Sequence, residues 1–321
     1  MKRYEKFVLE AEKGITFEVS KGTSGELIIR ALLQPLDYST NYVNPPIPEG
    51  YKHVCGEWNN GFVIERCSDG SQFVWIPVGS LDSNGTLDGE KFSEKFGRRN
   101  YRKNVFSNDG LQLPSEVYKE ALNARLLKQL ESVKKYGGFY ISRYNISKNS
   151  EGKPQSVKGA MPWTNISFTD ARKIASTIEN NEEVKSHLTF GAEYDSVLEW
   201  FIKTEVKTFA EIAQDSTKWG NNWNAREFRF KRDSWGSKDF TSKVVETGSR
   251  EEWCVNNIYD LSGNVDEWTQ EQRGSLYYVV RGGLYHGNGV FNEKPVAYRY
   301  CSHRDTDDCC YIGFRAALYI K

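Results

Sequence analysis

The sequence contains few cysteine, histidine, serine or glycine residues at the spacings that define known catalytic or metal-binding motifs. The six cysteines match no zinc-binding spacing, and the four histidines form no His-Glu-x-x-His pattern. The chain also has no Walker phosphate loop, no Gly-x-Gly-x-x-Gly fingerprint after a strand and no Gly-x-Ser-x-Gly nucleophile turn. One group of side chains remains as a candidate metal site, if folding brings its members together: His286, His303, Asp305, Asp307 and Asp308.

The composition is typical of a folded protein with large aromatic side chains in its core. Of the 321 residues, 14% are aromatic and 27% are charged, and the mean hydropathy is −0.65. The 43 basic and 43 acidic side chains cancel, so the chain lacks the basic excess of a nucleic-acid-binding domain. No apolar stretch reaches the roughly 18 residues of a membrane-spanning helix. We therefore expect no nucleic-acid partner and no membrane span.

The first residues and the cysteines indicate a compartment. The segment MKRYEKFVLEAEKG is charged and has no hydrophobic run, so it does not resemble a secretory signal. The adjacent Cys309 and Cys310 are poor partners for each other in a disulfide. We expect free thiols and a cytoplasmic location.

The chain divides by its patterning into a short leading segment and one large domain. Residues 1–45 contain two strand-like runs, TFEVS and ELIIRALL, and PPIPEG follows as a stiff boundary. Residues 46–321 form the large domain, in which GFVIERC and SQFVWIPVG predict a hairpin around Asp69 and Gly70. Residues 80–112 are polar and rich in Gly, Asn, Ser and Asp, which predicts a long loop or insertion.

Three segments of the large domain have the apolar spacing of amphipathic helices. They are residues 114–134, 167–178 and 193–204. The second of these has a capping signal, since Ser167 or Thr169 precedes its apolar run. The segment GGFYISRYNIS predicts a strand between the first and second helices.

The C-terminal part carries the most specific motifs, which are YDLSGNVDEW, then RGG, then GFR. In this order they resemble the formylglycine-generating-enzyme (sulfatase-modifying factor) family. The earlier segments FVWIPVG, YGGFYISRYNIS, PWTNISFTDARKIA and HLTFGAEYDSVLEW resemble that family as well, so the resemblance spans residues 50–321. It implies an α+β, C-type-lectin-like fold of the formylglycine-generating-enzyme subtype. Small twisted antiparallel sheets, two flanking helices and much irregular structure are expected.

The resemblance gives several motif residues a scaffold role. Gly282 and Gly283 of RGG are expected to permit positive φ angles or a close approach of the backbone. Arg315 of GFR is expected to be buried, which requires a carboxylate partner. Glu267 and Trp268 stand where the family buries a polar residue beside an aromatic one.

The resemblance also implies a structural calcium ion in the YDLSGNVDEW segment. Carried over position by position, Asp260 and Glu267 would supply side-chain oxygens, and Gly263 and Val265 would supply backbone carbonyls. Oxygen ligands on a tight loop suit Ca²⁺. Acidic residues are also common in turns that contain Gly and Asn, so the same residues have a second explanation. No other cofactor is expected.

The chain departs from the family at the two positions that carry its catalytic chemistry. Enzymatic members bind copper through two cysteines, and Gly287 and Asn292 occupy these places here. Without thiols the copper chemistry has no ligands, so we predict that the protein is not an enzyme. The alternative is a copper- or iron-dependent oxidase of this family.

The segment from Leu284 to Tyr311 resembles the hypervariable region of proteins diversified by retroelements. Those proteins share the C-type-lectin-like fold, and their variable region lies between RGG-like and IGFR-like motifs near the end of the chain. When the adenines of AAC and AAT codons are randomised, the resulting codons end in a pyrimidine and never encode Met, Trp, Lys, Gln or Glu. In the segment from Leu284 to Tyr311, only Glu293 and Lys294 belong to these five amino-acid types. The predicted ligand-binding residues are Leu284, Tyr285, His286, Gly287, Asn288, Val290, Phe291, Tyr300, Cys301, Ser302, His303, Asp305, Asp307, Asp308, Cys309, Cys310 and Tyr311.

We therefore predict a non-catalytic protein that binds a protein or cell-surface ligand through residues 284–311. Aromatic rings mixed with small polar side chains are typical of adaptable binding surfaces. Three aspartates in this segment favour a basic partner. The resemblance adds a phage particle as a second location. The remaining alternatives are a phage structural or receptor-binding component without diversification, and a divergent surface loop.

Overall fold

The computed structural model describes residues 15–21, 27–33, 45–78, 124–223, 243–273, 276–287, 289 and 295–321. The chain divides into two compact units, Met1–Tyr42 and Val43–Lys321. In the first unit, β1 (Ile15–Lys21) pairs with β2 (Leu27–Leu33) in an antiparallel ladder, as the strand-like runs predict. The predicted insertion at 80–112 lies outside the described residues.

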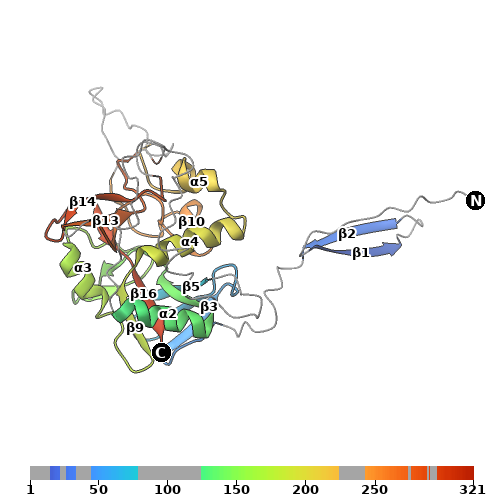
Figure 1. The fold of residues 1–321 in the computed structure, drawn as a ribbon, viewed down its shortest axis with the longest axis horizontal. Helices are drawn as coiled ribbons and strands as arrows, with labels where there is room; N and C mark the ends of the chain where they lie inside the picture. The colour runs from blue at the N-terminus through green and yellow to red at the C-terminus, as the bar shows by residue number, and fades with distance from the viewer. Residues whose placement is uncertain are drawn as a thin grey trace, which may run out of the picture. The chain divides into compact units, whose positions relative to one another are not determined.

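The larger sheet of the second unit has six strands in the order β3-β4-β5-β6-β16-β9, and each neighbouring pair is antiparallel. β16 lies between β6 and β9, so the last strand of the chain is in the interior of the sheet (Figure 1). The predicted hairpin is confirmed as β4 and β5. The strands are β3 (Tyr51–Cys55), β4 (Val63–Arg66), β5 (Gln72–Pro77), β6 (Gly138–Ser142), β9 (Val184–Leu188) and β16 (Ala316–Ile320).

A four-stranded sheet has the order β14-β13-β12-β15, in which only the β12–β15 pair is parallel. Short two-stranded ladders join β7 to β8 and β10 to β11. The bounds are β7 (Ser147–Lys148), β8 (Pro154–Gln155), β10 (Cys254–Val255), β11 (Ile258–Tyr259), β12 (Asp266–Arg273), β13 (Tyr277–Arg281), β14 (Tyr300–Arg304) and β15 (Ile312–Phe314).

Strand β14 lies where the sequence, CSHRDTDDCCY after Tyr300, shows neither the helix nor the strand period. Its pairing with β13 shifts register between Tyr278 and Val280. A shifted ladder breaks the period of two that a regular strand shows in its sequence, so alternation alone does not reveal it.

Helices α2 (Ala124–Tyr136), α3 (Phe168–Ala175) and α4 (Gly191–Lys203) overlap the three predicted helical segments, whereas α5 (Phe209–Ala213) was not predicted. The 3₁₀ turns η2 (Thr217–Trp219) and η4 (Glu251–Trp253) accompany them. Ser167 is the N-cap of α3 and accepts a hydrogen bond from the Asp170 amide, as predicted. Residues 114–123 of the first predicted helix lie outside the described residues.

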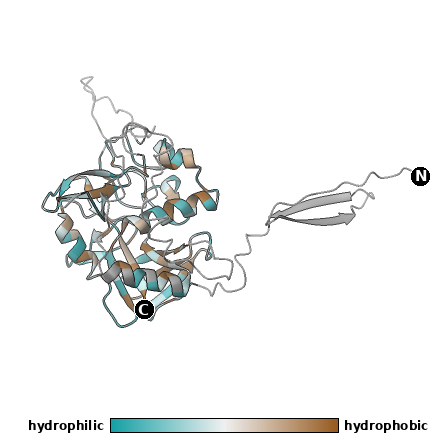
Figure 2. Ribbon diagram, in the orientation of Figure 1, coloured by the Kyte–Doolittle hydropathy of each residue, from teal (hydrophilic) through white to brown (hydrophobic). Residues whose placement is uncertain are grey.

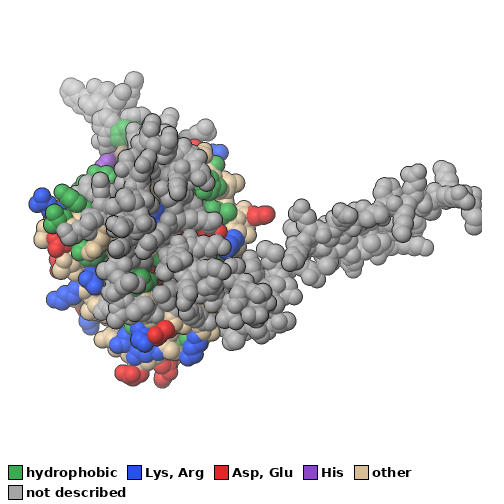
Figure 3. All heavy atoms as spheres, in the orientation of Figure 1, with side chains coloured by type: hydrophobic (Ala, Val, Ile, Leu, Met, Phe, Trp, Pro, Cys, Tyr) green, Lys and Arg blue, Asp and Glu red, His purple; other side chains and the backbone are tan. Residues whose placement is uncertain are grey.

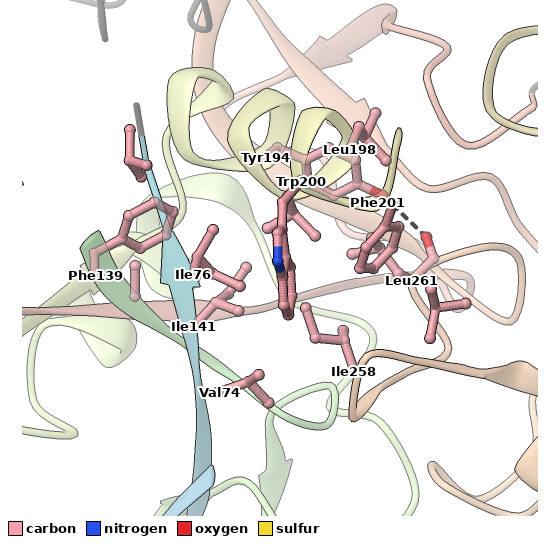
Figure 4. Packing of buried hydrophobic residues seen from close by; sticks show 14 of the residues in the cluster. Val74, Ile76, Phe139, Ile141, Tyr194, Leu198, Trp200, Phe201, Ile258 and Leu261 are labelled. Carbon is pink, nitrogen blue, oxygen red and sulfur yellow. Dashed lines mark hydrogen bonds between the residues drawn. The ribbon is translucent and has the colours of Figure 1, made fainter. Parts of the chain in front are cut away.

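Two hydrophobic clusters hold the domain together. In the first, α4 packs on β5 and β6, and Figure 4 shows its side chains meeting Ile258 and Leu261. Figure 2 shows hydrophobic residues on the central strands and on α4, and hydrophilic ones on α3. In the coloured part of Figure 3, basic and acidic side chains intermix on the surface. The domain is thus a sheet-rich α+β structure whose strands are mostly antiparallel.

Two further expectations concern thiols and membranes. The described thiols are free, namely Cys55, Cys67, Cys254, Cys309 and Cys310, which confirms the prediction for these five. Among the described residues, no helix has both the length and the apolar character that crossing a membrane requires.

Candidate functional site

Two arginines and two acidic residues form a buried ion cluster that joins α4, β12 and β13 to the C-terminal segment. Arg281 donates to Asp195 Oδ1 at 2.6 Å and lies 3.3 Å from Glu271 Oε1. Arg299 donates from Nε to Glu271 Oε2 at 2.9 Å and from Nη2 to Asp195 Oδ2. All four side chains are buried. The first residue of α4 is a glycine, Gly191, and a larger residue would not fit there. A Cβ at this position would lie 1.6 Å from Glu271 Oε1.

A second buried ion pair holds the GFR motif. Arg315 Nε donates to Glu267 Oε1 at 2.7 Å, and its Nη1 donates to the Ser142 carbonyl at 3.0 Å. The expectation of a buried Arg315 with a carboxylate partner is therefore confirmed, and both Glu267 and Trp268 are buried as expected. Burial raises the pKa of Glu267 to about 7, while Arg315 and Asn145 favour its charged form.

The glycines of RGG have the backbone conformations that their role predicts. Gly282 has φ 92° and Gly283 has φ 79°. A Cβ on Gly282 would lie 3.0 Å from the Leu261 carbonyl oxygen and 3.1 Å from the Tyr194 hydroxyl. That hydroxyl donates to the Leu261 carbonyl at 2.9 Å, so the turn after β13 packs directly on α4.

Five predicted site residues meet in one run of ring contacts, although they are far apart in the sequence. The ring centroids of Tyr285 and His286 are 4.7 Å apart, and those of His286 and Tyr311 are 5.1 Å apart. His303 continues the run, at 6.5 Å from Tyr311 and 5.4 Å from Tyr300. We call these five residues the aromatic run. It brings the two ends of segment 284–311 together.

The exposure of these residues corrects part of the predicted set. His286 is exposed, and Tyr285, Tyr300 and Tyr311 are half-buried. Leu284 and His303 are buried, so the expectation that they are surface residues is wrong. Other buried members of the segment are Gly289, Pro295, Val296, Ala297 and Arg299. Sequence periodicity does not show this, because the shielding comes from distant elements.

The three aspartates lie on the turn that follows β14. Asp305 and Asp308 are exposed, and Asp307 is half-buried. Asp307 Oδ2 accepts a hydrogen bond from the Arg304 amide at 2.8 Å and lies 3.8 Å from His303 Nδ1. In the part of the chain that the structure describes, no group of three or more His, Cys, Asp or Glu side chains is suited to holding a metal ion.

Several predicted residues cannot be placed in this site. Asn288, Val290, Phe291 and Asn292 lie outside the described residues. For Cys301 and Ser302 the structure describes only the backbone, within β14. Cys310 is exposed and Cys309 is half-buried. Gly287 is half-buried, and its amide donates to the Leu284 carbonyl at 2.9 Å.

The profile of the sulfatase-modifying factor enzyme 1-like domain (FGE-sulfatase) matches residues 62–320. The chain belongs to this family. The match runs from the start of β4 into β16, so it covers most of the second compact unit. No curated protein matches the chain.

In this sulfatase-modifying factor domain, the residues expected to bind calcium already have other partners. Asp260 Oδ2 accepts hydrogen bonds from Thr247 Oγ1 at 2.8 Å and from the Gly248 amide at 2.7 Å, while its Oδ1 is buried without a hydrogen bond. Glu267 pairs with Arg315, so a cation would compete with the guanidinium there. Gly263 and Val265 lie on the loop between the two acids. The residues do not form a ready cation site, and calcium stays a prediction.

The structure adds one residue to the site that the motifs did not single out. Trp223 is 37% exposed, and its amide donates to the Gly287 carbonyl at 2.9 Å. Ser216 makes a similar bond to the Gly289 carbonyl at 2.8 Å. The segment 284–311 therefore borders the loop after α5. The sequence around it, KWGNNWN, contains two tryptophans, but nothing in that stretch indicates that it lies next to segment 284–311.

The ion cluster predicts that Arg299 is a fixed scaffold residue although it lies inside the segment that is predicted to vary. We expect Arg299→Met to lower the free energy of unfolding by about 3–5 kcal/mol, because it leaves the buried carboxylates of Asp195 and Glu271 with a single guanidinium, that of Arg281, between them. The matched control Arg304→Met removes an exposed arginine and should change stability by less than about 0.5 kcal/mol. Urea unfolding followed by fluorescence measures both values. Equal stability of the two variants would contradict the scaffold role.

Proposed function

We propose that this chain is a non-catalytic ligand-binding protein with a C-type-lectin-like fold of the formylglycine-generating-enzyme subtype. Its binding face is the exposed part of segment 284–311, and a retroelement diversifies that face. The partner is a protein or cell-surface ligand, and the protein works in the cytoplasm or as part of a phage particle without a required cofactor.

The observation that carries this proposal is that the aromatic run lies in a segment anchored by buried arginines. Arg281 and Arg315 are buried at both ends of the segment, and Arg299 is buried within it. The side chains between these arginines include rings and polar groups that are exposed or half-buried. A rigid scaffold that carries exposed variable side chains tolerates their substitution at little cost in stability. Tyrosine and histidine rings then supply contact area with few rotatable bonds.

Our proposal that the protein is not an enzyme rests on the two positions at which enzymatic members of the family have copper-binding cysteines. Gly287 and Asn292 have no thiol, so the ligands for copper are missing there. The six cysteines of the chain stand elsewhere, and three of them follow Tyr300.

The binding face predicts that exposed positions of the segment can be varied to select new partners. A yeast-display library of the full chain, randomised at His286, Asp305, Thr306, Asp308 and Cys310, should yield binders to a purified test protein such as hen lysozyme. The matched control library is randomised at five exposed positions on the β7–β8 turn and helix α3, which are Lys148, Ser150, Lys153, Arg172 and Lys173. Equal yields from both libraries would contradict a specialised face.

Retroelement diversification predicts a specific arrangement of the genetic locus. Sequencing related isolates should reveal a near-copy of the coding segment for residues 284–311 beside a reverse-transcriptase gene. The copy should carry adenines wherever the two segments differ. The codons for Arg299, Val296 and Ala297 should be identical in all isolates, because these residues are buried. An invariant segment without a template copy would rule out diversification.

The non-catalytic assignment predicts no turnover of a sulfatase-type cysteine peptide. The purified chain, incubated with copper and oxygen, should produce no formylglycine that mass spectrometry detects above a heat-denatured sample. The double variant Gly287→Cys/Asn292→Cys, which carries both thiols, serves as the matched comparison. Formylglycine formation by the unmodified chain would favour the oxidase alternative.

A further inference from the structure

A cavity of about 440 Å³ opens between α2, β9 and β16. Figure 1 shows these elements near the C-terminus, away from β13 and β14, so the cavity is separate from the binding face. Its volume lies in the range of small-molecule sites. The lining residues include four lysines and one glutamate: Lys128, Lys135, Lys185, Lys321 and Glu131.

Two of the four lysines form no ion pair with an aspartate or glutamate side chain in the part of the chain that the structure describes. Lys128 pairs with Glu131 at 2.7 Å, and Lys321 lies 3.5 Å from a glutamate, Glu182. Lys135 instead donates to the main-chain oxygen of Lys321 at 3.3 Å, and Lys185 forms no ion pair with a described residue. The cavity therefore has a net positive lining.

The walls that carry these lysines are held in place by buried contacts. Ser132 of α2 is buried and accepts a hydrogen bond from the Ile320 amide at 3.1 Å, which ties α2 to β16. Gln129 of the same helix donates to Glu193 of α4 at 2.5 Å. Tyr319 and Ile320 add apolar surface to the lining. Ammonium groups on a rigid, partly apolar wall suit an anion that several donors can contact at once.

We propose that this cavity binds a small molecule carrying a phosphate chain, with Lys135 and Lys185 as the principal phosphate-binding residues. A lysine ammonium is a compact charge with three donors, which suits phosphate oxygens. The volume exceeds what a single phosphate needs, so a diphosphate or a larger phosphate ester fits the cavity better. The proposal is independent of the binding face on segment 284–311.

Isothermal titration of the full chain with inorganic pyrophosphate and with ADP tests the proposal. Both compounds should bind, and the affinity should fall when the salt concentration rises, because salt screens the charges. The double variant Lys135→Gln/Lys185→Gln should bind at least tenfold more weakly. The control variant Lys148→Gln/Lys153→Gln removes the same charge from the β7–β8 turn and should bind like the unmodified chain. Thermal melts check that both variants fold.

Each other outcome overturns the proposal. If the unmodified chain binds neither compound, the cavity is not a phosphate site. If both double variants lose affinity equally, the attraction is a nonspecific effect of net charge. If ADP binds and pyrophosphate does not, recognition rests on the organic part of the ligand and not on the phosphate chain.

Discussion

The ion cluster is the constraint on which the rest of the domain depends. Two guanidinium groups out of water are tolerated only when carboxylates meet them, so Arg281 and Arg299 must stay next to Asp195 and Glu271. These four residues come from α4, β12, β13 and the C-terminal segment. Their pairing therefore fixes the position of a helix, two strands and the segment at once. Removing one member would leave the remaining three with an unbalanced charge in the interior, which costs more than losing a surface ion pair.

The position of the last strand explains why both ends of the segment are rigid. β16 lies inside the larger sheet, and β15 pairs in parallel with β12. Arg315 is the single residue that connects β15 to β16 in the sequence, and its side chain pairs with Glu267 on β12. The chain must therefore leave the core after Arg281 and return before Arg315. The residues between these points form a long excursion with anchored ends, which is an arrangement that allows surface variation without disturbing the core.

Local patterns predicted much of this fold, and distant partners account for the rest. The cap at Ser167 and the β4–β5 hairpin depend on residues within a few positions, so their signals are in the sequence. The need of Arg315 for a carboxylate was also predictable, because a buried guanidinium requires one. The partners of Arg299 were not, since Glu271 and Asp195 are 28 and 104 residues away. The same limit explains why His303 was wrongly expected at the surface.

The buried residues also divide the proposed binding face into two stretches that depend on each other. Because Arg299 is buried in the ion cluster, the positions that we propose to vary fall before and after it. Tyr285 and His286 come from the first stretch, and Tyr311 comes from the second, yet His286 contacts both tyrosine rings. Substitutions at contacting positions are not additive in their effects. A change at His286 therefore alters the surroundings of both tyrosines, and a new specificity depends on combinations drawn from the two stretches together.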